Sequence, residues 1–95
     1  MKPKTPDKIF QLRDRVLVEY FEDGALILNQ NDHHFCELNC TASDALKKTD
    51  GQRNIGQIAQ LVATDYEMPL SDVLQDIIEL FDRLIEQKIV KRVKA

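Results

Sequence analysis

The sequence has few of the residues on which the common chemistries of small proteins depend. Its two cysteines, Cys36 and Cys40, are too few and too close for a disulfide framework, so we expect reduced thiols. Its three glycines exclude a glycine-rich loop that cradles phosphate. No apolar run is long enough to span a bilayer, and the first residues lack the apolar centre of a secretory signal. We therefore expect a cytoplasmic protein with no membrane partner.

Length and charge narrow the function further. The 95 residues make one domain with a modest core and little room for a deep catalytic cleft. A formal net charge of -3 gives no general attraction to nucleic acid or to anionic lipid. The sequence thus favours a non-catalytic protein, and we expect it to bind no cofactor.

The first half of the chain has the composition of three strands. Two runs rich in β-branched and aromatic residues, 16–21 and 25–29, are separated by Asp23-Gly24, which predicts an antiparallel hairpin with a type I′ turn. After a polar turn, residues 33–38 predict a third strand. Its alternation places His34, Cys36 and Leu38 on one face and His33, Phe35 and Glu37 on the other.

The second half has the periodicity of three helices. Thr41 with Asp44 resembles a capping pair, and Asp50-Gly51 ends the first helix. Asn54 with Gln57 is a second capping pair and opens a helix that ends near Glu67. The third and longest helix lies within residues 69–90, with Ser71 as its expected cap. The order of elements predicts an α+β fold.

The long helix has an apolar surface wider than a single core requires. The apolar arc covers about 160°, whereas a helix on one core needs about 100°. The opposite side is acidic. The apolar surface consists of one row formed by Val73, Ile77, Leu80 and Leu84, and a second formed by Leu74, Ile78, Phe81 and Ile85.

We expect an N-terminal arm at residues 1–14, partly disordered, and a folded domain at residues 15–95. The arm contains prolines and alternating charges. Ile9, Phe10 and Leu12 are candidates to dock on the domain.

A small open sheet leaves edge strands whose free backbone groups can recruit an extended peptide. If the long helix lies beside such an edge, its surplus apolar surface forms one wall of a groove.

The segment at residues 38–62 resembles the signature region of the PqqD family. The matching residues are Leu38, Asn39, Ala42, Leu46, Asp50, Gly51, Ile55 and Ile58, followed downstream by Asp72, Val73, Asp76, Ile77 and Leu84. The resemblance covers about residues 15–90. It implies a winged-helix-like domain, a three-stranded antiparallel sheet followed by three helices, that serves as a recognition element for ribosomally made and later modified peptides.

Domains of this family bind the leader region of a precursor peptide between the third strand and the third helix and present it to a modifying enzyme, often a radical SAM protein. Carried over to this sequence, the resemblance implies strand addition along residues 33–38. Charged or polar residues beside the helical stripe, among them Gln87, would set the register. The expected peptide-binding residues are His33, His34, Phe35, Cys36, Glu37, Leu38, Val73, Asp76, Ile77, Leu80, Arg83 and Leu84.

Three other interpretations compete with this one. A metal site at His33, His34, Cys36 and Cys40 is disfavoured because strand alternation sends His33 away from its neighbours, so we expect no metal. A winged-helix DNA-binding regulator would need a basic helix, whereas the exposed side of the long helix has five carboxylates against Arg83. A dimerising interaction module would cover the surplus apolar surface with a second copy. We expect a monomer or a weak homodimer.

Overall fold

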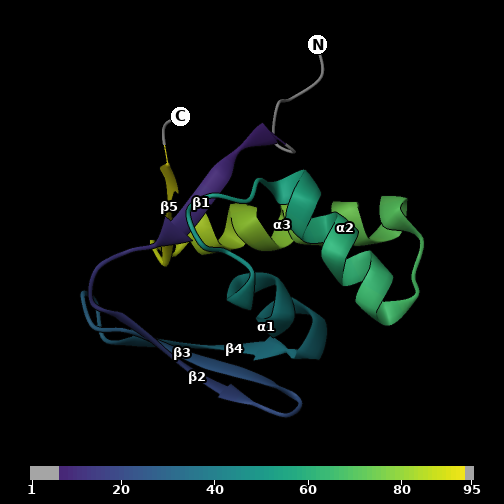
Figure 1. Ribbon diagram of the computed structural model, residues 1–95. Helices are drawn as coiled ribbons and strands as arrows, with labels where there is room; N and C mark the ends of the chain where they lie inside the picture. Colours follow the sequence, from purple (N-terminus) through teal and green to yellow (C-terminus); the bar gives the residue numbers. More distant parts are fainter. Residues whose placement is uncertain (1–6, 94–95) are drawn as a thin grey trace.

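The computed structural model describes residues 7–93 and forms a mixed α+β fold (Figure 1). Within this range no helix combines the length and the apolar character that crossing a membrane requires. The elements in chain order are β1 (Ile9–Leu12), β2 (Val16–Phe21), β3 (Gly24–Asn29), β4 (His34–Asn39), α1 (Cys40–Lys47), α2 (Ile55–Tyr66), α3 (Leu70–Glu86) and β5 (Val90–Val93).

The predicted antiparallel sheet of three strands is confirmed, in the order β2-β3-β4. Phe21 pairs with Gly24, so the loop of the first hairpin is Glu22-Asp23 and neither of its residues has positive φ. The type I′ turn predicted at Asp23-Gly24 is therefore wrong. Gly24 is needed for a different reason: a Cβ there would lie 2.2 Å from the carbonyl oxygen of Leu38 on β4. A side chain at position 24 is therefore excluded by the close approach of β3 to β4 and not by the turn.

A second sheet, of two strands, was not predicted. β1 pairs antiparallel with β5, from Ile9 opposite Val93 to Leu12 opposite Val90. The expected arm of residues 1–14 therefore includes a strand, and Phe10 is buried as part of the core. Residues 1–6 of that arm lie outside the described residues. The long helix ends at Glu86, earlier than the 69–90 stretch suggested, because Lys88 adopts positive φ and redirects the chain into β5.

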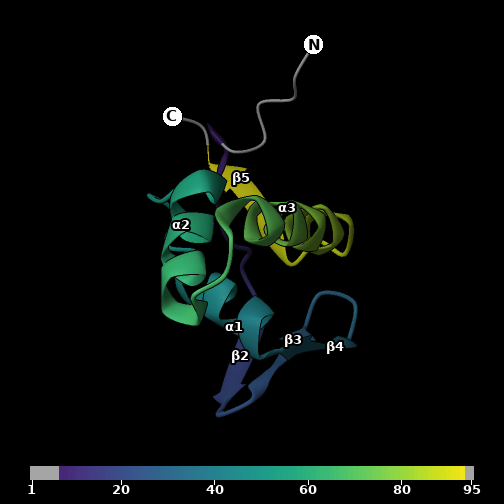
Figure 2. The same ribbon diagram turned by 90° about the vertical axis from the view of Figure 1, so that its right-hand side faces the viewer.

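All three helices lie on the same side of the β2-β3-β4 sheet, in both views of the molecule (Figures 1 and 2). The predicted capping box of α2 is confirmed, with the Asn54 side chain accepting from the Gln57 amide and Gln57 returning the bond. The other two predicted caps are wrong. Asn39, and not Thr41, caps α1, and α3 begins after Pro69 with no side-chain cap.

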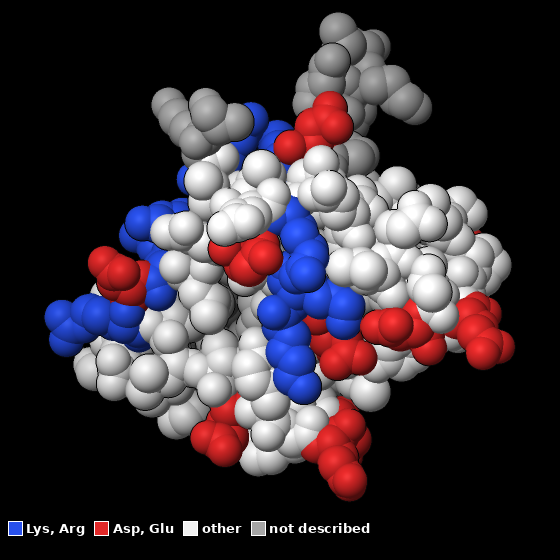
Figure 3. Space-filling model, in the orientation of Figure 1, with Lys and Arg blue, Asp and Glu red and all other residues white. Residues whose placement is uncertain are grey.

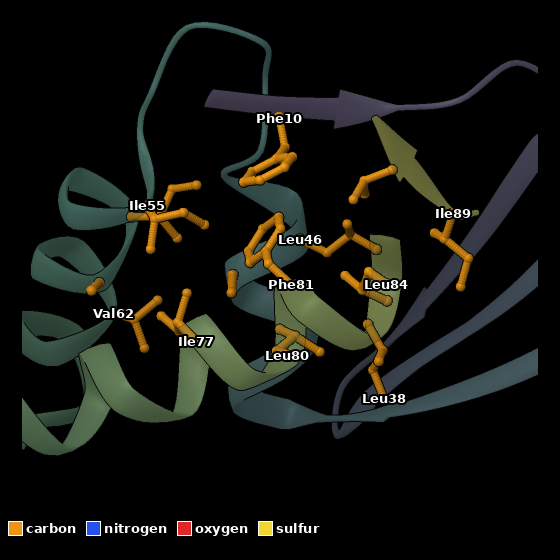
Figure 4. Packing of buried hydrophobic residues seen from close by; sticks show 14 of the residues in the cluster. Phe10, Leu38, Leu46, Ile55, Val62, Ile77, Leu80, Phe81, Leu84 and Ile89 are labelled. Carbon is orange, nitrogen blue, oxygen red and sulfur yellow. The ribbon is translucent and has the colours of Figure 1, made fainter. Parts of the chain in front are cut away.

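The core lies between the helices and the sheet and continues up to β1 and β5 (Figure 4). α3 runs through its centre, and in that view its residues Ile77, Leu80, Phe81 and Leu84 lie among labelled side chains from β1, β4, α1 and α2. Burial of such side chains is the main source of stability in a domain of this size. Leu38, on β4, joins the strand to this core.

One buried polar side chain fixes the end of α3 against the sheet. Asn29, at the end of β3, is 2% exposed. Its Nδ2 donates to the carbonyl oxygens of Gln87 (3.2 Å) and Lys88 (3.3 Å), which follow α3. Its Oδ1 accepts from the backbone amide of Asn31. Because the last carbonyls of a helix have no partners within the helix, these bonds satisfy groups that burial would otherwise penalise.

Candidate functional site: a groove between β4 and α3

β4 is an edge strand. β3 pairs with one of its sides, and among residues 7–93 no strand pairs with the other. The free backbone amides and carbonyls of an edge strand are able to pair with another extended chain. β4 ends at Asn39, whose side-chain oxygen accepts from the Ala42 amide at 2.8 Å and starts α1 directly. The free edge therefore has a defined length of six residues, His34–Asn39.

Cavities follow this edge along its length and lie between it and α3. At the start of β4 a cavity of ≈ 660 Å³ is lined by His34, Phe35 and Cys36 on one side and by residues 86–89 on the other. At the end of β4 a shallower one, ≈ 440 Å³, is lined by Glu37, Leu38, Asn39, Ala42 and Arg83. We refer to these two cavities together with the next one as the β4/α3 groove.

The third cavity, of ≈ 360 Å³, continues from the end of β4 along α3. It shares Asn39, Ala42 and Arg83 with the second cavity, so the two are contiguous. Its apolar lining comes from α1, from α3 and from the α2–α3 connection. This part of the groove is lined by Asn39, Thr41, Ala42, Met68, Val73, Asp76, Ile77, Glu79, Leu80 and Arg83.

The apolar residues expected to point into the groove are mostly part of the core. Val73, Ile77 and Leu84 are almost completely buried, and Leu80 is nearly so. Val73, Ile77 and Leu80 reach the groove only as its floor, and Leu84 lines none of its three cavities. The surplus of the apolar surface lies on the other flank of α3, where Ile85 is exposed. The expected wall of surplus apolar side chains is therefore wrong.

The wall of the groove on the α3 side is instead polar. Asp76 and Arg83, two of the expected peptide-binding residues, are exposed and line it, and Gln87 lines it at the end nearer the start of β4. Arg83 takes part in none of the ion pairs found among residues 7–93. Its guanidinium is therefore available to an incoming carboxylate.

The expected residues of β4 divide between its two faces. Leu38 is buried in the core and Cys36 is half-buried on the same side, whereas Phe35 and Glu37 are exposed on the opposite side. His34 is exposed, and its Nδ1 lies 3.3 Å from the Asp32 carboxylate. His33 precedes the strand in a turn with φ of 60°, so the expectation that it belongs to the strand is wrong.

Several residues that line the groove were not among the predicted site residues. Asn29 and Lys88 line the larger cavity together with Arg13, which lies between β1 and β2. In the sequence Asn29 belongs to a polar turn cluster, and Arg13 lies in the expected arm. The signal that could have identified Asn29 is its position at the end of a strand whose alternate residues, Ala25 and Ile27, face the core.

Cys40 belongs to a hydrogen-bonded cluster that does not include Cys36. The Cys40 Sγ lies 2.9 Å from the hydroxyl oxygen of Tyr66, which in turn donates to the Asp44 carboxylate at 2.6 Å. The bond to Asp44, and to a smaller extent the one to Cys40, raises the pKa of Tyr66. This cluster joins α1 to α2. Within residues 7–93 no three His, Cys, Asp or Glu side chains converge as metal ligands would.

Three solved structures have the same fold. TbiB1 in complex with the TbiA(beta) leader peptide matches with a TM-score of 0.77 at 14% identity, over 85% of this chain and 94% of that one. Lasso peptide synthetase B1 complexed with the leader peptide matches with a TM-score of 0.75 at 24% identity, over 86% and 96%. At these identities the likeness defines the class of fold.

The third structure is the solution structure of the PqqD truncation of Methylobacterium extorquens PqqCD, described as a functional, stand-alone recognition element for ribosomally synthesised and post-translationally modified peptides. It matches with a TM-score of 0.77 at 22% identity, over 94% of each chain. None of the curated proteins matches the chain. The sequence model of the family described as Coenzyme PQQ synthesis protein D (PqqD) matches residues 24–90. The chain therefore belongs to the PqqD family, as its resemblance predicted.

Proposed function

We propose that this protein is a non-catalytic carrier that captures the leader region of a ribosomal precursor peptide and presents it to a peptide-modifying enzyme. The observation that carries the proposal is the free edge of β4 beside a groove closed by α3. A peptide that pairs with this edge gains main-chain hydrogen bonds, and its alternate side chains enter the groove. The family and the leader-peptide complexes of two proteins of the same fold support it.

The groove favours a particular kind of peptide. Its floor at Val73, Ile77 and Leu80 suits an apolar side chain, and Arg83 beside it suits a carboxylate one or two positions away. Backbone pairing tolerates many sequences, and these two features supply the selectivity. The modifying enzyme, a radical SAM protein in many pathways of this family, would act on the part of the precursor beyond the bound segment.

The charges of α3 favour a peptide over DNA. Five carboxylates, from Asp72, Asp76, Glu79, Asp82 and Glu86, lie on its exposed positions, and Arg83 is the single arginine among them. Binding to a duplex gains affinity from basic residues that replace counterions on phosphate. An acidic helix of this kind repels phosphate, so a recognition-helix role for α3 is unfavourable.

Calorimetric titration with synthetic peptides tests the proposal. The peptides tile the short open reading frames that lie beside this gene. One of them should bind the wild-type protein, and Arg83→Glu should weaken its affinity by about ten- to hundredfold, since a hydrogen bond to a charged group contributes about 1.5–3 kcal/mol. Lys91→Glu makes the same change of charge on β5, away from the groove, and should leave the affinity unchanged. Binding of none of the peptides, or equal weakening by both variants, contradicts the proposal.

A further inference from the structure

The β2-β3-β4 sheet has a bare face. The helices, together with β1 and β5, lie on one side of it in both views of the molecule (Figures 1 and 2). Among residues 7–93 no element covers the other side, which we call the outer face. Along β2 every second residue is exposed, as expected for a strand with one face against the core.

The outer face is apolar where an exposed face is normally polar. Leu17 is paired with Leu28, and Leu28 with Phe35, so three apolar side chains form a row across the three strands. Leu17 is 53% exposed and Phe35 67%. Phe21, at the other end of β2 and in the same alternating set, is 53% exposed.

Exposed apolar side chains are more concentrated on the outer face than on the rest of the described surface. Seven large apolar side chains are exposed among residues 7–93, and three of them, Leu17, Phe21 and Phe35, are on the outer face. The remaining four are spread over α2, α3 and the connection between them. Single exposed apolar residues are normal, whereas a gathered group with a polar rim marks an interaction surface.

The rim of this surface is acidic. Glu19 and Glu37 lie on the two outer strands of the sheet, on either side of Leu26, because Leu26 on the central strand pairs with both. Glu22 and Asp23 form the turn at one end. In Figure 3 the Lys and Arg side chains gather in a vertical band down the middle and on the left of the molecule, and Asp and Glu side chains lie on several sides of it, including the lower margin, where Figure 1 shows the sheet.

The carboxylates of the outer face indicate which kind of partner would bind there. A second copy of the chain would bring the carboxylates of two acidic rims together, and like charges in contact oppose association. A partner with an apolar contact surface edged by Lys and Arg would be complementary to the outer face. We propose that the outer face is the docking surface for the peptide-modifying enzyme, and that this enzyme presents such a basic-edged apolar surface to it.

This inference rests on the proposed function and explains how capture and presentation are combined. Phe35 and Glu37 belong to β4, the same strand whose free edge would receive the peptide. A strand added there extends the sheet, so that the outward side chains of the peptide come to lie beside Phe35 and Glu37. The enzyme would thereby contact the carrier and the bound peptide on one continuous surface.

The test uses variants of β2, which is separated from the peptide-binding edge by β3. The purified products of the larger open reading frames beside this gene are titrated against immobilised wild-type protein and against the double variant Leu17→Ser, Phe21→Ser. One product should bind the wild type, and the double variant should weaken it by about tenfold or more, as loss of central apolar contacts does. Glu19→Lys should weaken it as well. Leu61→Ser, which removes an exposed leucine from α2, is the matched control and should have no effect.

Failure of every product to bind the wild type would overturn the inference, and so would equal binding to the wild type and the double variant. Sedimentation that shows a wild-type dimer and a monomeric double variant would also overturn it, by assigning the face to a second copy. Peptide affinity is measured separately on the same variants and should be unchanged. If the wild type binds no peptide but the enzyme still needs Leu17 and Phe21, the proposed function fails while the docking surface stands.

Discussion

The rings of Phe10 and Phe81 are stacked, with centroids 5.3 Å apart and an angle of 27° between the ring planes. Phe10 belongs to β1 and Phe81 to α3, so this pair joins the start of the described chain to the central helix. β1 is held on both sides, by β5 and by the loop before α2, where the Gly51 amide donates to the Phe10 carbonyl. The N-terminal strand is therefore a structural part of the domain.

Phe10→Ala should lower the free energy of unfolding by about 3–5 kcal/mol, because it leaves a cavity against Phe81 in a core where Phe10 is 3% exposed. Urea unfolding followed by circular dichroism measures this. Phe35→Ala is the control, since the same change at a 67% exposed position should cost about 0.5 kcal/mol or less. Similar losses for the two variants would show that β1 does not pack as described.

Asn29→Ala should destabilise the protein by about 1–3 kcal/mol, since it leaves the carbonyls of Gln87 and Lys88 without their buried partner. The same variant should weaken the peptide, because the end of α3 is no longer held against the start of β4. Asn31→Ala removes the bonds that its side chain donates to the Asp14 carbonyl and to the Asn29 Oδ1, but it leaves the bonds of Asn29 to Gln87 and Lys88 in place and should cost less. An Asn29→Ala variant with the same free energy of unfolding as the wild type would refute the role given to this side chain.

The stability contributed by Tyr66 should decrease at alkaline pH. Its hydrogen bond to Asp44 raises the pKa of Tyr66 in the folded protein above the ordinary 10.0. The folded state therefore holds the proton more tightly than the unfolded state, and this stability is complete below pH 10 and is lost as the pH rises toward the folded pKa. The difference in unfolding free energy between the wild type and Tyr66→Phe should narrow when urea unfolding is repeated above about pH 10.

An absorbance titration measures the same group directly. The chain has two tyrosines, so the variant Tyr20→Phe leaves Tyr66 as the single source of tyrosinate absorbance. The midpoint should lie above 10.0, and a midpoint at or below that value would mean that the bond to Asp44 is absent in solution.

Periodicity and turn residues predicted the local elements of this fold. The hairpin of β2 and β3, the strand β4 and all three helices follow from patterns within short stretches of sequence. The pairing of β1 with β5 does not, because Ile9 and Val93 lie at opposite ends of the chain and nothing in either segment specifies the other. In the sequence, residues 90–93 therefore have the pattern of the end of the long helix.

The groove was predicted in outline and not in its lining. An edge strand beside an amphipathic helix was inferred from the order of elements, and Asp76 and Arg83 do line the groove. Which flank of the apolar stripe faces the strand depends on the rotation of α3 about its axis. Packing against α2 and β1 sets that rotation, and a single sequence does not encode it in any local pattern. Ile77 was therefore assigned to the groove wall, whereas it is almost completely buried and reaches the groove only as part of its floor.

The central claim is that a peptide pairs with the free edge of β4. Amide hydrogen exchange, measured by NMR with and without the bound leader peptide, tests it most directly. The account predicts that an alternating set of amides within His34–Asn39 exchanges rapidly in the free protein and becomes protected when the peptide binds, with no change at the other open edges, Val16–Phe21 and Val90–Val93. Binding that leaves the β4 amides unprotected, or protects those of β5 instead, would contradict it.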